Sequence, residues 1–182
     1  MPSVTRKAKS KREERREELR ESLLAAVEAM VANGESFTEL SVERLVQEAG
    51  LSRSTFYVYF EDKGDLVRAW FSQILEELRE AAAPWWRLDE SATRDDVREV
   101  LARIVTTYRP HTTLMAAVYD TASYDTLVGE EVAEMMGANI ASLRSHIRRG
   151  QKAGWVTPDL LPDETASWLM WMAEREIGRA HV

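Results

Sequence analysis

The 182-residue sequence predicts an all-α protein. Apolar residues recur at helical spacing along most of the chain. No stretch long enough for a strand alternates between apolar and polar residues. Glycine and proline, which weaken or break helices, number only 8 and 5. Hydrophobic residues make up 45% and charged residues 30%, the balance of a folded globular protein. A chain of this length can bury a core in one domain or in two small ones.

The first helix is predicted from Lys11 to Ala32, where Asn33 and Gly34 provide a C-terminal signal. Its apolar positions repeat with helical spacing: Leu19, Leu23, Val27, Met30 and Val31. Two short helices follow, from Val42 to Glu48 and from Arg53 to Tyr59, with Ser41 and Ser52 as their N-terminal caps. A fourth helix is expected from Asp62 to Ala83, because Pro84 ends it.

The C-terminal part is also expected to be helical, at about 93–108, 112–123, 126–150 and 162–180. The third of these segments keeps one face apolar over five turns. Gly150, Gly154 and Pro158 predict a loop after it. Pro162 then suits the first turn of the last helix.

The composition excludes several kinds of chemistry. The absence of cysteine rules out disulfides, zinc–thiolate sites and thiol catalysis. The three histidines are scattered, and no carboxylate–histidine pair, phosphate loop or nucleophile motif is present, so we expect no metal, no cofactor, no catalytic residues and no enzyme. No stretch approaches 18 apolar residues and the first twenty residues lack an apolar core, so we expect a cytoplasmic protein without a membrane partner.

Charge is distributed unevenly along the chain. Residues 1–12 contain five basic residues and no acid, although the whole chain has a net charge of −7. We therefore expect residues 1–12 to form a basic disordered arm on an acidic body. Charge alone is equally consistent with a nucleic-acid-binding arm and with a solubilising tail.

Residues 40–70 contain the pattern that indicates function. Two short helices joined by a four-residue turn at Gly50 form a helix-turn-helix arrangement. In such a motif the start of the second helix faces base edges, and Arg53 can donate two hydrogen bonds to guanine. Tyr57 and Tyr59 place hydroxyls within reach of phosphates, and the small core is expected from Leu45, Val46, Leu51 and Phe56.

Other interpretations of these residues remain open. A turn with Ala49 and Gly50 is also common in plain helical bundles. The tyrosines are candidates for core residues, as Phe56 and Phe60 are expected to be. Arg44 suits a solvated helix position at least as well as a DNA contact.

The same stretch resembles the DNA-binding domain of the TetR family of bacterial transcriptional regulators. The matching features are Leu40-Ser41, Ala49-Gly50-Leu51-Ser52, Thr55-Phe56-Tyr57-Val58-Tyr59-Phe60, and then Lys63 and Leu66. The resemblance implies a helix-turn-helix DNA-binding domain at 13–66 and a helical ligand-binding and dimerisation domain at 67–182. It also implies contacts to DNA from these residues: Ser41, Arg53, Ser54, Thr55, Tyr57 and Lys63. The residue pattern adds Arg44, Ser52 and Tyr59 as candidate DNA-binding residues.

The C-terminal part concentrates aromatic residues and methionines, which pack adaptably around irregular apolar shapes. The resemblance implies a pocket for an effector here. Because few polar groups lie within reach, the ligand is expected to be largely apolar. The candidate ligand-binding residues are Trp86, Tyr108, Met115, Tyr119, Met136, Asn139, Trp168 and Met172. Ordinary core and dimer-interface packing is the better explanation for any one of them, and it is the cluster as a whole that favours a ligand cavity.

The expected function is therefore a sequence-specific DNA-binding regulator that represses transcription until a small apolar ligand releases it. The resemblance implies a homodimer that pairs its last two helices and reads a double-stranded, palindromic operator. The alternative is a helical adaptor that binds only proteins. An adaptor leaves the Ser-Arg-Ser-Thr start of the second short helix unexplained.

Overall fold

The structure, a computed structural model, describes residues 11–179 and the side chains of residues 11–175. It is all-helical over these residues, as predicted, with no strand among them. The helices are α1 Lys11–Ala32, α2 Val42–Glu48, α3 Arg53–Tyr59, α4 Lys63–Ala82, α5 Arg94–Tyr108, α6 Thr112–Ala122, α7 Thr126–Ala153 and α8 Pro162–Arg179. Three short 3₁₀ turns connect them at Phe37–Glu39, Trp85–Arg87 and Arg109–His111. Most of the predicted basic arm lies outside the described residues, and Lys11 and Arg12 already belong to α1.

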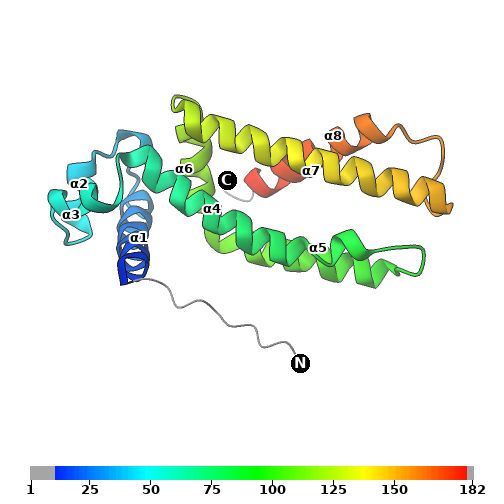
Figure 1. The fold of residues 1–182 in the computed structure, drawn as a ribbon, viewed down its shortest axis with the longest axis horizontal. Coiled ribbons are helices and arrows are strands. Elements are labelled where there is room, and N and C mark those ends of the chain that lie inside the picture. Colours follow the sequence, from blue (N-terminus) through cyan, green and yellow to red (C-terminus); the bar gives the residue numbers. More distant parts are fainter. Residues whose placement is uncertain (1–10, 180–182) are drawn as a thin grey trace. The chain divides into compact units, whose positions relative to one another are not determined.

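The chain divides into two compact units, Met1–Ala69 and Trp70–Val182. The first contains α1, α2, α3 and the start of α4, and the second contains the rest of α4 with α5 to α8 (Figure 1). Helix α4 is thus a continuous element to which both units contribute residues.

The N-terminal unit packs α1 against α2 and α2 against α3. Its core is apolar and almost fully buried, and it includes the following residues: Leu19, Leu23, Val27, Met30, Leu45, Val46, Phe56, Phe60 and Leu66. Leu51, which the sequence placed in this core, is only half-buried in the turn that joins α2 and α3. Only five of the 22 residues of α1 are buried, and charged side chains cover most of the remaining surface of the helix.

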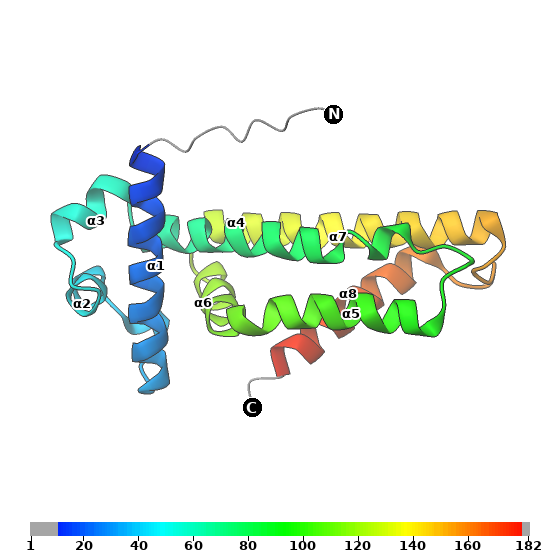
Figure 2. The same ribbon diagram turned by 90° about the horizontal axis from the view of Figure 1, so that it is seen from below.

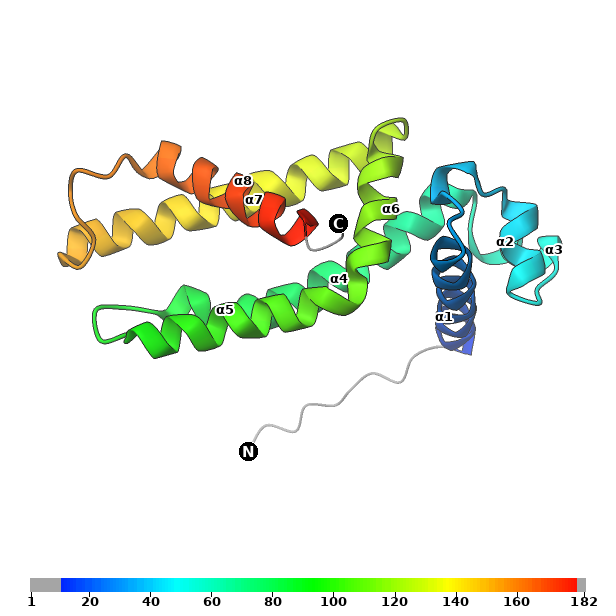
Figure 3. The ribbon, with the colours of Figure 1, turned by 180° about the vertical axis from the view of Figure 1, so that it is seen from behind.

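In the C-terminal unit, α8 runs back along α7 and α6 packs across the start of α7 (Figures 2 and 3). Asp125 caps α7 by accepting hydrogen bonds from the backbone N–H groups of Leu127 and Val128 at 3.0 and 3.1 Å. Thr93 and Asp96 form a reciprocal capping box at the start of α5. These polar groups fix where the helices begin, which the sequence predicted to within one residue at both positions.

The sequence prediction for the end of α7 was wrong. The helix continues to Ala153, beyond the expected end at residue 150, and stops at Gly154, whose φ of 88° reverses the chain. Gly150 is a buried helical residue rather than part of the loop. A Cβ atom there would lie 2.5 Å from the Val156 side chain and 2.8 Å from that of Trp155. Gly150 is therefore required for close packing and not for a turn.

Candidate DNA-binding surface

The start of α3 is organised by a cluster of hydroxyl groups. The Ser52 Oγ accepts a hydrogen bond from the Thr55 backbone N–H at 3.0 Å and so caps the helix, as predicted. The same oxygen lies 2.7 Å from Thr55 Oγ1 and 2.8 Å from Ser54 Oγ. Ser52, Ser54 and Thr55 therefore form one hydroxyl cluster at the start of the helix, and Ser52 and Ser54 are exposed.

The outward face of α3 consists of Arg53, Ser54, Tyr57 and Val58, which repeat at three- and four-residue intervals. Tyr57 is 47% exposed and Val58 is 60% exposed. The Arg53 guanidinium lies 5.8 Å from the centre of the Tyr57 ring, and no carboxylate of residues 11–175 forms an ion pair with it. This face thus combines a guanidinium without an ion pair among residues 11–175, hydroxyls and a methyl-bearing side chain, the kinds of group that read the major groove.

Sequence reasoning missed Val58. Its position four residues after Ser54 places it on the outward face, and that spacing was available in the sequence. A methyl-rich side chain in this place suits contact with the methyl group of thymine.

The opposite face of α3 anchors the helix in the core. Phe56 is 1% exposed, and its ring centre lies 5.4 Å from that of Phe60, which is equally buried. Phe56 also meets the Tyr57 ring edge-on at 5.3 Å. The core role expected for Phe56 and Phe60 agrees with this packing, which determines which residues of α3 face outward.

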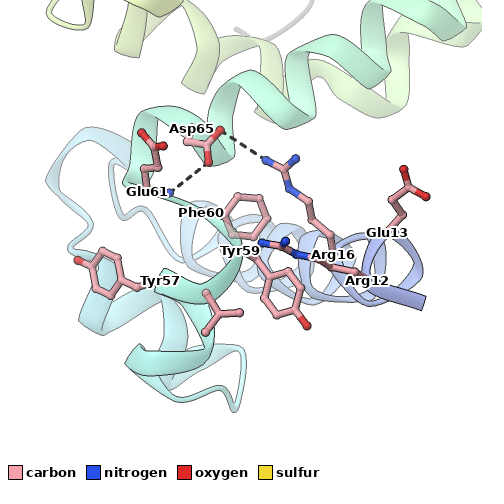
Figure 4. Close-up of a pocket in the computed structure, with 9 residues that line it drawn as sticks. Arg12, Glu13, Arg16, Tyr57, Tyr59, Phe60, Glu61 and Asp65 are labelled. Atoms are coloured by element: carbon pink, nitrogen blue, oxygen red, sulfur yellow. Dashed lines mark hydrogen bonds and ion pairs between the residues drawn. The ribbon is translucent and has the colours of Figure 1, made fainter. Parts of the chain in front are cut away.

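Tyr59 points elsewhere than Tyr57. Both tyrosines and Val58 line a hollow of about 340 Å³ with residues of α1, and Figure 4 shows the Tyr59 ring beside Arg12 and the Tyr57 ring turned the other way. The Arg16 guanidinium lies 3.5 Å from the Asp65 carboxylate and 5.2 Å from the centre of the Phe60 ring, so it is already engaged. Glu13 and Glu61 also line the hollow, which therefore has a mixed charge.

Ser41 and Arg44 belong to the start of α2. The Ser41 Oγ accepts a hydrogen bond from the Arg44 backbone N–H at 3.2 Å, which confirms the predicted cap. The Arg44 guanidinium donates to Glu48 at 3.0 Å and to Glu35 at 3.4 Å. These ion pairs favour the solvated helix position for Arg44 over a DNA contact.

Lys63 occupies a place that the sequence did not foresee. Its Nζ donates to the backbone carbonyls of Phe37, Thr38 and Leu40 at 3.0, 3.0 and 3.1 Å. It also lies 4.8 Å from the centre of the Phe37 ring, and burial lowers the pKa of the ammonium below its usual value. An ammonium group has three donors, and all three are used here. Lys63 therefore joins the start of α4 to the segment before α2, and the phosphate contact expected of it stays a prediction.

The predicted ligand-binding residues differ widely in exposure. Tyr108 and Met115 are buried. Four others are half-buried: Trp86, Tyr119, Met136 and Asn139. Trp168 is 62% exposed and Met172 is 39% exposed on α8, so neither lines the interior of the unit. Two open hollows of about 340 Å³ each lie in the N-terminal unit, and none of the eight residues lines them.

A carboxylate that sequence reasoning overlooked lies among these residues. The Tyr119 hydroxyl donates to the Glu174 carboxylate at 2.6 Å, which connects α6 to α8. Burial, with the Glu174 charge, raises the pKa of Tyr108 to about 12. Burial, then the hydrogen bond to Glu174 and the Glu174 charge, also raise the pKa of Tyr119 above its usual value. No spacing in the sequence relates positions 108, 119 and 174, because packing of three helices brings them together.

A second polar group lies among tryptophans at the far end of α7. The His146 ring centre lies 5.4 Å from that of Trp155 and about 6 Å from those of Trp85 and Trp86. The Arg149 guanidinium donates to His146 Nδ1 at 2.6 Å and to the Trp86 carbonyl at 2.8 Å. Burial and the Arg149 charge lower the pKa of His146, so the neutral ring is the favoured form.

Residues 11–175 hold no group of three or more metal-binding side chains, and no helix of the described chain is long and apolar enough to cross a membrane. The capped helix α3, with Arg53, Ser54, Tyr57 and Val58 on its exposed face, completes a helix-turn-helix arrangement with α2. Residues 23–70 match the family described as bacterial regulatory proteins, tetR family. The resemblance of this stretch to the TetR family, expected from the motifs in residues 40–70, is thereby confirmed.

Solved structures share the fold over nearly the whole chain. A provisionally assigned TetR-family transcriptional regulator from Rhodococcus sp. is 22% identical with a TM-score of 0.66, over 89% of this chain and 87% of that one. The fatty acid degradation regulator FadR from Bacillus halodurans is 17% identical with a TM-score of 0.59, over 95% and 86% of the two chains. A TetR-family transcriptional regulator from Haemophilus influenzae is 20% identical with a TM-score of 0.51, over 87% and 86%. No curated protein is significantly similar in sequence to this chain.

Proposed function

We propose that this TetR-type regulator reads its operator through the outward face of α3. The observation that carries the proposal is the exposed set of Arg53, Ser54, Tyr57 and Val58 on a helix whose other face is locked by Phe56. Arg53 selects guanine, Val58 favours a thymine methyl, and the hydroxyls of Ser54 and Tyr57 contact neighbouring groups of the DNA. Ser41, Ser52 and Thr55 support the helix ends from which these contacts are made.

We propose further that the protein binds DNA as a homodimer formed through α7 and α8. Trp168 and Trp171 are 62% and 64% exposed on α8, and Met172 beside them is also exposed. An exposed apolar patch on a regulator of this size indicates an interface. Sedimentation at micromolar protein should therefore give about twice 20.8 kDa, and a soluble monomer that still protects a two-fold symmetric site would contradict this.

The test of DNA reading is selection of bound sequences from a random double-stranded pool. A two-fold dimer predicts enrichment of two inverted half-sites whose centres lie about 34–36 Å apart or a multiple of that distance. A pool from which no sequence is enriched, while binding still falls steeply with salt, would leave only non-specific DNA affinity. A chain that binds no DNA but retains helical structure would favour the adaptor alternative.

The regulatory part of the proposal is repression relieved by a small ligand with a largely apolar body, bound in the C-terminal unit. Tyr108, Met115 and Tyr119 lie in or near the core of that unit and are the predicted ligand residues that support the proposal best. Helix α4 links the two units through a continuous backbone, as a ligand response requires. In a reconstituted transcription assay the protein should silence a promoter that overlaps the selected site. A coupling free energy of about 1–3 kcal/mol between ligand binding and DNA binding would be enough to relieve repression.

A further inference from the structure

Three helices of the C-terminal unit bring two tyrosines and one carboxylate together. Tyr108 lies at the end of α5, Tyr119 on α6 and Glu174 on α8. The Tyr119 hydroxyl donates to the Glu174 carboxylate at 2.6 Å, and the Glu174 charge also acts on the Tyr108 hydroxyl. Figures 2 and 3 show the end of α8 approaching α6 within this unit.

Among the described side chains of residues 11–175, this cluster contains a negative charge and no positive charge. Glu174 is half-buried, and no Lys, Arg or His side chain of residues 11–175 forms an ion pair with it. Its described donor is a neutral hydroxyl, although other half-buried carboxylates such as Asp65 pair with arginine. A carboxylate removed from water is stabilised most by a cation, and tyrosine ring faces also attract cations.

Apolar side chains lie next to the cluster along the same helices. Met115 precedes Tyr119 by four residues, and Met170 precedes Glu174 by four, so each pair shares a helix face. Met115 is 2% exposed and Met170 is half-buried. A ligand anchored at Glu174 would thus extend its body along methionine side chains, which adapt to irregular apolar shapes.

We propose that Tyr108, Tyr119 and Glu174 bind the protonated amine of an effector whose remaining body is apolar. The amine takes the carboxylate as its counter-ion and packs against the tyrosine rings. An alcohol can donate a hydrogen bond to Glu174, as the Tyr119 hydroxyl does, but it brings no positive charge. A carboxylate ligand is repelled by Glu174. This inference rests on the proposed ligand response, and it specifies the charge of the ligand.

The experiment compares matched compounds that differ only in their polar end. Benzyl, 4-phenylbutyl and decyl bodies would each be supplied as amine, alcohol and carboxylate, and binding would be measured by tryptophan fluorescence and calorimetry at pH 7. The proteins would be the wild type, Glu174→Gln, Tyr119→Phe and the control Glu99→Gln, which removes an exposed carboxylate from α5. Circular dichroism would establish that each variant is folded.

For at least one body the amine should bind the wild type about tenfold more tightly than the alcohol, as a charge-assisted contact predicts. Glu174→Gln should remove that preference, Tyr119→Phe should weaken it, and Glu99→Gln should keep it. The inference is overturned if no amine is preferred over its alcohol, or if folded Glu174→Gln retains the preference. Failure of the proposed function would look different, because the unliganded wild type would then select no DNA sequence from the random pool.

Discussion

Replacing Lys63 with methionine separates a structural role of this residue from a DNA contact. Methionine keeps the length of the aliphatic chain and removes the ammonium group. The carbonyls of Phe37 and Leu40 then lose a donor in a partly buried setting, whereas the carbonyl of Thr38 is exposed and can turn to water. Each partly buried hydrogen bond contributes about 1 kcal/mol net. The free energy of unfolding should therefore fall by about 2 kcal/mol.

The assay is urea unfolding followed by circular dichroism, with Lys152→Met as control because Lys152 is exposed on α7. The control should change the unfolding free energy by less than about 0.5 kcal/mol. DNA binding of Lys63→Met would be measured in parallel at several salt concentrations. Removal of a phosphate contact would reduce the slope of log K against log salt by about one unit. A structural Lys63 leaves that slope unchanged. A variant of unaltered stability with the reduced slope would refute the structural role.

Three further predictions follow from the packing. Val58→Ala should weaken binding to a selected operator by about 1 kcal/mol and reduce the preference for thymine at one position, measured by competition with substituted duplexes. Gly150→Ala should destabilise the protein by about 1–3 kcal/mol through overpacking. Gly137→Ala, whose added methyl group would meet no atom within 4 Å, should stabilise it by up to about 1 kcal/mol. Urea unfolding measures both changes. Because the pKa of His146 is lowered in the fold, the folded state binds a proton more weakly than the unfolded state, and stability should fall as the pH drops below about 6.5. Thermal melts at about pH 7.5 and 5.5, on either side of that value, should show a larger loss for the wild type than for His146→Gln, which keeps an acceptor for Arg149.

Helix positions and caps could be predicted because their causes are local. Ser41 and Ser52 cap the helices that follow them, and the 3.6-residue period of Leu19, Leu23 and Val27 identifies the buried face of α1. The outward direction of Arg53 follows from the same period, once Phe56 is assigned to the core.

Features that depend on contacts between distant segments could not be predicted. Lys63 finds its carbonyl partners 23 to 26 positions earlier in the chain, and Glu174 finds Tyr119 55 positions earlier. Gly150 carried a turn signal in the sequence, but the space it provides is used by Trp155 and Val156. In each case the residue type is visible in the sequence, and its partner is set by packing.

Sequence reading by α3 through Arg53, as proposed above, can be tested with a single substitution. The most direct measurement is the ratio of affinities for a selected operator and a scrambled duplex, determined for the wild type and Arg53→Ala at two salt concentrations. The substitution should cost about 1–3 kcal/mol on the operator, and the ratio should fall accordingly while preference at one base position is relaxed. An unchanged ratio for a folded Arg53→Ala protein would contradict the assignment of this face as the reading surface.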